Sequence, residues 1–128
     1  MGKRVLGDNP IPPIFVVDGL DVGVFASVDD AVLQLEAVDV KQDEYFSYDG
    51  EGRLLRLIAD GDRVTAQLAE TEPSHAEELS TILRDFLKEM GVKGVEDSSC
   101  DFQCLVEASR KFIYSPPRFW PFRKRSNG

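Results

Sequence analysis

The sequence predicts an α+β domain, in which an antiparallel sheet, built from a hairpin and a three-stranded meander, carries about three helices packed on one face. Two kinds of observation predict this class. Asp-Gly turn signals separate short β-rich runs, and three other segments repeat apolar residues at helical spacing. Because strands and helices do not alternate along the chain, a layered α+β arrangement is favoured over a parallel sheet.

The chain has 128 residues, which suits one hydrophobic core and is too short for two ordinary domains. Residues 1–13 are expected to be an irregular lead-in, since Asn9-Pro10 and Pro12-Pro13 block regular structure. A single folded domain is expected over residues 14–114. A basic, aromatic tail follows over residues 115–128.

The strands are predicted from β-rich runs on either side of turn residues. The first two runs, 14–17 and 22–25, flank Asp18-Gly19-Leu20-Asp21, which has the turn chemistry of a hairpin. The last run alternates apolar and polar residues, which indicates a sheet with one buried face. The meander is expected to have strands at 45–48, 53–59 and 63–69, joined by turns at 49–52 and 60–62.

Two of the helices are predicted from capping signals followed by apolar stripes. The first covers residues 28–37 and begins after Ser27, which has an aspartate three residues further on. The second begins with a capping box formed by Ser74 and Glu77. It ends at Gly91, where a left-handed C-terminal cap is needed.

A third helix is predicted from about Ser98 or Ser99 to Ser115-Pro116-Pro117, and it contains both cysteines of the chain. Cys100 and Cys104 are only four residues apart, and this short separation argues against a structural disulfide. Free thiols in a reducing compartment are expected instead.

No apolar stretch forms the core of a signal peptide or approaches the ~18 residues that a membrane helix requires. Together with the free thiols, this predicts a cytoplasmic protein.

Catalytic and metal sites are not indicated. The single histidine, His75, falls in the first turn of the second helix, where an exposed structural role is favoured over a catalytic one. Zinc needs three or four nitrogen or sulfur ligands, and Cys100 with Cys104 supplies at most two. The acidic turns lack the glycine and the glutamate that a calcium loop needs. We therefore expect no catalytic residue, no metal and no cofactor.

Charge is distributed unevenly along the chain. Residues 9–109 hold 22 of the 23 carboxylates against seven bases, which gives −15, whereas residues 110–128 hold six bases and no acid. An acidic body repels phosphate backbones and speeds encounters with cationic partners. The sequence therefore predicts a basic protein partner, with no nucleic acid bound to the acidic body.

The tail from Arg118 to Arg125 interleaves bases with aromatic residues, as a contact with nucleic acid or a membrane surface would. The alternative is a short terminus without a binding role, or one folded back onto the acidic body.

Several segments between residues 14 and 87 resemble small bacterial proteins that are encoded beside polymorphic or contact-dependent toxins. The resemblance implies an immunity function, meaning inhibition of a toxin domain by tight binding. The segments that carry it are Pro13-Ile14-Phe15-Val16, Asp21-Val22-Gly23-Val24-Phe25, Ser27-Val28-Asp29-Asp30-Ala31 with Leu35-Glu36, Tyr48-Asp49-Gly50-Glu51-Gly52-Arg53-Leu54-Leu55, and Ser74-His75-Ala76-Glu77-Glu78-Leu79.

Charge and resemblance together suggest a stoichiometric inhibitor that occludes the basic groove of a nuclease-like toxin domain. The alternatives are an adaptor that binds nucleic acid or a membrane surface through the tail, and a small enzyme that uses surface carboxylates. The expected partner contacts are carboxylates of the hairpins and nearby loops, with two tyrosines as aromatic anchors: Asp43, Glu44, Tyr45, Tyr48, Asp49, Glu51, Asp60 and Asp62.

Overall fold

The computed structural model describes residues 9–19, 21–35, 40, 45–96 and 99–113. The first hairpin is present as expected: strands β1 (Ile14–Asp18) and β2 (Asp21–Phe25) pair in antiparallel fashion. The meander consists of β3 (Phe46–Tyr48), β4 (Leu54–Asp60) and β5 (Arg63–Leu68), again with antiparallel pairs.

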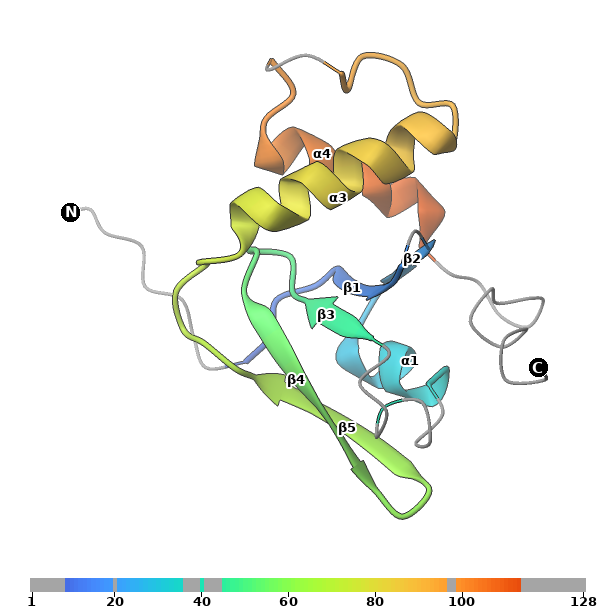
Figure 1. The fold of residues 1–128 in the computed structure, drawn as a ribbon, viewed down its shortest axis with the longest axis vertical. Helices are drawn as coiled ribbons and strands as arrows, with labels where there is room; N and C mark the ends of the chain where they lie inside the picture. Colours follow the sequence, from blue (N-terminus) through green and yellow to red (C-terminus); the bar gives the residue numbers. More distant parts are fainter. Residues whose placement is uncertain (1–8, 20, 36–39, 41–44, 97–98, 114–128) are drawn as a thin grey trace.

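Hairpin and meander join into one five-stranded sheet with the strand order β2-β1-β3-β4-β5 (Figure 1). The junction is the antiparallel pairing of β1 with β3, in which Val16 lies opposite Ser47. The α+β class predicted from the sequence is therefore confirmed.

The helices cover both faces of the sheet, so the prediction that they pack on one face is wrong. Ile14 and Val16 of β1 point into a cluster with α1 (Val28–Leu33), whereas Phe15 and Val17 point into a second cluster with α3 (Ala76–Glu89) and α4 (Phe102–Ser109). All four of these β1 side chains are buried. A continuous apolar run in a strand requires cover on both sides, because successive side chains point to opposite faces.

The end of α1 and the start of α3 differ from the expected ones. The Ser27 side chain caps α1 by accepting a hydrogen bond from the Asp30 amide, as expected, but α1 ends at Leu33. The start of α3 is not capped by Ser74: its N-cap residue is His75, whose side chain makes no capping bond. The positive φ of 84° at Gly91 fits the predicted end of α3.

Helix α4 is shorter than the predicted third helix. Asp101 caps its start by accepting a hydrogen bond from the Cys104 amide, and the helix ends at Ser109. A 3₁₀ turn, η1 (Arg110–Phe112), follows, and Ile113 then forms a parallel bridge with Val24 of β2. The predicted stop signal at 115–117 lies outside the described residues.

Cys100 and Cys104 form a disulfide, so the expectation of free thiols is wrong. The reason is that Cys100 is not part of the helix. It precedes the N-cap residue Asp101, whose backbone is extended, so Cys100 lies just outside the first turn of α4. The two Cα atoms are 5.1 Å apart, within the range that a disulfide spans.

Within the described ranges, no helix is both long enough and apolar enough to cross a membrane.

Candidate functional site

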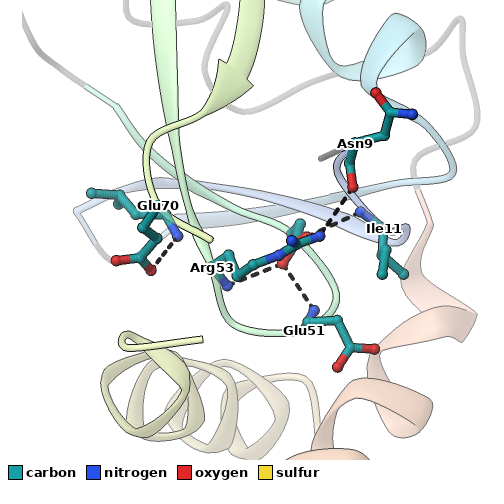
Figure 2. A network of polar contacts seen from close by, with 7 residues as sticks. Asn9, Ile11, Glu51, Arg53 and Glu70 are labelled. Carbon is teal, nitrogen blue, oxygen red and sulfur yellow. Dashed lines mark hydrogen bonds and ion pairs between the residues drawn. The ribbon is translucent and has the colours of Figure 1, made fainter. Parts of the chain in front are cut away.

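The turn between β3 and β4 is organised around a buried carboxylate, that of Asp49. It accepts hydrogen bonds from the backbone amides of Ile11, Glu51 and Arg53, each at 3.0 Å, and from Nε of the Arg53 guanidinium at 3.0 Å (Figure 2). Both charged side chains are fully buried. A buried carboxylate tolerates this position only because its oxygens are so well bonded.

The same ion pair ties the lead-in to the sheet. Nη2 of Arg53 donates to the carbonyl of Asn9 at 3.0 Å, and the Gly50 amide donates to the carbonyl of Ile11. The turn is packed so tightly that a Cβ at Gly50 would lie 2.6 Å from the Pro12 carbonyl oxygen. The arrangement is that of a structural anchor rather than a binding surface.

A second polar cluster joins this turn to the start of α3. One carboxylate oxygen of Glu70 accepts from the Leu54 amide at 2.7 Å and lies 2.8 Å from Nδ1 of His75. The Tyr48 hydroxyl donates to the Glu78 carboxylate. Burial first, then this hydrogen bond and the nearby Glu78 charge, raise the pKa of Tyr48 far above its usual value.

The His75–Glu70 pair resembles the orienting half of a catalytic dyad. Such chemistry also needs a nucleophile within reach of the imidazole. Among the contacts of the described residues, His75 is hydrogen-bonded through its ring to Glu70 alone. Nor do the described residues contain a group of three or more histidine, cysteine or carboxylate side chains placed to hold a metal ion.

The eight predicted contact residues do not form one surface. Asp49 was expected to be exposed and is fully buried, because the amides of its own turn and Arg53 enclose it. Tyr45 and Tyr48, expected to be anchors, are buried in the two core clusters. Asp43 and Glu44 lie outside the described residues.

The remaining three carboxylates lie at opposite ends of β4. Glu51 is half-buried beside the β3–β4 turn, whereas Asp60 and Asp62 are exposed at the β4–β5 turn. Strand β4 has seven residues and so spans about 23 Å.

A surface that the sequence did not predict lies on the sheet. The face of β1 and β3 that α3 and α4 cover continues onto β4 and β5, where these helices do not reach, and Figure 1 shows the β4–β5 hairpin extending away from them. We call the uncovered part the open face. From the strand register, its side chains are Phe46, Arg56, Ile58, Asp60, Arg63, Thr65 and Gln67.

Phe46 is the most prominent residue of the open face, with 61% of its surface exposed. Arg56, Thr65 and Gln67 are also exposed, and Ile58 is half-buried. Because successive side chains of a strand point to opposite faces, the sequence could show that Phe46 and Tyr45 lie on different faces. It also puts Phe46 on the same face as Tyr48, which is buried there. Only the position of α3 decides that Tyr48 is covered and Phe46 is not.

The exposed charge of the described residues is mainly negative. Thirteen carboxylates are exposed against six bases. Asp60 lies on the open face, at the end of β4, and Asp62 follows in the turn between β4 and β5. Others lie in β2, α1, α3, α4 and the loops: Asp21, Asp29, Asp30, Glu72, Glu77, Glu78, Asp85, Glu89, Glu96, Asp101 and Glu107.

Comparison of the chain with protein-family models, with curated proteins and with solved structures found no match. The fold and the surface of the described residues define an α+β domain with a partly uncovered antiparallel sheet and more exposed acids than bases.

Proposed function

We propose that the chain is a protein-binding module without catalytic activity, which inhibits a basic, toxin-like protein domain by binding it stoichiometrically. The observation that carries this proposal is the open face with the exposed Phe46. A large aromatic side chain that is mostly exposed on a sheet is unfavourable in water and is the type of residue that anchors protein interfaces.

The carboxylates at the hairpin tip support a basic partner. Asp60 lies at the hairpin end of the open face and Asp62 in the turn that follows, and the exposed surface of the described residues carries more acids than bases. Such a surface attracts a cationic partner over a distance and raises the rate of encounter. In a nuclease-like domain, these carboxylates would occupy positions that substrate phosphates otherwise take.

The regular pairing of the β4–β5 hairpin supports tight binding. Strands β4 and β5 are paired over six residue pairs, from Leu55 opposite Leu68 to Asp60 opposite Arg63. On the reverse side of the sheet, Leu55 and Val64 are buried in the α1 cluster. A surface that is already ordered loses little conformational entropy when a partner binds.

The experiment is an affinity capture from lysate of the native source at low and at moderate salt, followed by binding titration with the purified partner. We expect one basic protein in a 1:1 complex, whose affinity falls as salt rises. Asp60→Asn with Asp62→Asn should weaken binding. The matched control, Glu89→Gln with Glu96→Gln, also removes two exposed charges and should leave the affinity nearly unchanged.

Three outcomes would contradict the proposal. Equal loss of affinity in both double variants would mean that net charge alone, and not the hairpin tip, attracts the partner. Chemical conversion of the partner on incubation would indicate an enzyme. Capture of nucleic acid alone, lost on deletion of residues 115–128, would favour the tail adaptor instead.

A further inference from the structure

The disulfide joins a buried residue, Cys100, to an exposed one, Cys104. Cys100 is 2% exposed and packs in the cluster between the sheet, α3 and α4, whereas Cys104 is exposed in the first turn of α4. A thiol in solution therefore reaches only the sulfur of Cys104.

Hydrogen bonds from α3 also hold the backbone on the N-terminal side of this disulfide. The guanidinium of Arg84 on α3 donates from Nε to the carbonyl of Val95 at 2.9 Å and from Nη2 to the carbonyl of Cys100 at 3.0 Å. Val95 is buried as well. Because these bonds involve no sulfur, they hold the backbone of the loop whether the cysteines are oxidised or reduced.

The start of α4 depends more directly on the disulfide. Asp101 caps the helix through the Cys104 amide, and the disulfide links the residues on either side of that cap. Opening the bond removes one restraint on this turn and leaves the Asp101 cap in place, while Leu105 and Val106 of the next turn are buried. The effect of reduction should be confined to the first turn of α4 and to the residues just before it.

We propose that Cys100–Cys104 is a reversible thiol–disulfide exchange site for a dithiol reductant, with Cys104 as the attacked sulfur. A thiolate of the dithiol bonds to Sγ of Cys104, and the bond to Cys100 breaks. Cys100 leaves as a thiolate and takes up a proton. The second thiol of the reductant, as thiolate, then displaces Cys104, which is protonated in turn. Two electrons and two protons pass to the protein, and the reductant departs as its disulfide.

The site distinguishes dithiols from monothiols. After attack by a monothiol, Cys100 lies beside the mixed disulfide and closes the ring again, since an intramolecular thiol has a very high effective concentration. A dithiol avoids this reversal, because its second thiol displaces Cys104 from the mixed disulfide. Burial of Cys100 also makes it a poor leaving group, so attack is slow compared with that on an exposed disulfide.

The test uses the full chain with dithiothreitol, glutathione and iodoacetamide, read by mass spectrometry. We expect no alkylation before reduction and two alkyl groups after treatment with dithiothreitol. Reduced glutathione should leave the wild-type chain mainly oxidised. With oxidised glutathione, Cys100→Ala should accumulate a mixed disulfide at Cys104. Alkylation of Cys104 in that variant should be at least about tenfold faster than that of Cys100 in Cys104→Ala.

Hydrogen exchange of the wild-type chain, oxidised and reduced, provides a readout that does not depend on the variants. Faster exchange on reduction is expected around residues 99–105, with the strands unchanged. Two thiols that resist reoxidation, equal reactivity of the two cysteines, or faster exchange throughout β1–β5 would each overturn the assignment. None of these measurements requires a protein partner, so the inference stands or falls separately from the proposed function.

Discussion

Asp49 and Arg53 form an ion pair whose side chains are both fully buried, with 2.9 Å between Oδ2 and Nη2. The pair spans the turn from β3 to β4 and bonds to the backbone of the lead-in through Ile11 and Asn9. It therefore connects this turn to a segment that lies 38 or more residues earlier in the sequence. The acidic turn that looked like an exposed contact site is the internal anchor of the sheet.

Removing one partner of this pair should destabilise the fold strongly. We expect Arg53→Ala to lower the free energy of unfolding by about 3–5 kcal/mol, because the Asp49 carboxylate is then buried without its countercharge. Arg56→Ala removes an exposed arginine from the same region of the chain and should change stability by less than about 0.5 kcal/mol. Urea denaturation measures both. A similar small loss in the two variants would mean that the pair is not what holds the turn.

Gly52 and Gly61 provide a second matched comparison. Both have positive φ, 88° and 66°. A Cβ added at Gly52 would lie 2.6 Å from Cα of Ala76, whereas a Cβ added at Gly61 would meet nothing within 4 Å. We expect Gly61→Ala to cost about 1 kcal/mol from backbone strain alone. Gly52→Ala should cost about 1–3 kcal/mol more, because α3 must move. Equal losses in thermal unfolding would contradict the packing of α3 against this turn.

Tyr48 should make stability depend on pH in the alkaline range. Its folded-state pKa is raised by burial and by Glu78, so the unfolded chain releases the phenol proton first, near pH 10. The stabilising contribution is therefore complete below about pH 10 and is lost as the pH rises above that value. Tyr48→Phe should remove this part of the alkaline loss. Measured unfolding curves from pH 8 to 11 that decline equally in both proteins would show that Tyr48 is not responsible.

The disulfide should contribute modestly to global stability, because it closes a loop of only five residues. In the chain-entropy treatment, such a loop corresponds to about 2 kcal/mol. We expect Cys104→Ser, and wild-type protein in reductant, to lose about this amount in urea denaturation and to remain folded at room temperature. Unfolding on reduction would mean that the bond is a requirement of the fold and not a local restraint.

Local signals in the sequence predicted the elements well and their environment less well. The Asp-Gly turns located the meander, and Ser27 located the start of α1, because turn and capping chemistry acts between residues close in sequence. The burial of Asp49 depends on Arg53 and on the lead-in folding over it. The prediction of helices on one face was wrong, although four consecutive apolar residues in β1 are a signal of cover on both faces.

In the candidate site, too, local features were predictable from the sequence and burial was not. The sequence indicated an acidic surface, and exposed carboxylates at Asp60 and Asp62 agree with it. It could not distinguish the exposed Phe46 from the buried Tyr48, since both side chains point to the same face of β3. That distinction depends on how far α3 extends across the sheet, which is a property of the packed domain.

The central claim is that the open face binds a protein partner, and the most direct measurement is a calorimetric titration of the captured partner with wild-type chain and with Phe46→Glu. Because Phe46 is 61% exposed, the variant should unfold at nearly the wild-type temperature. We expect a 1:1 complex with wild type and an affinity lower by about 30-fold or more for the variant. Equal affinities of the two folded proteins would contradict the claim.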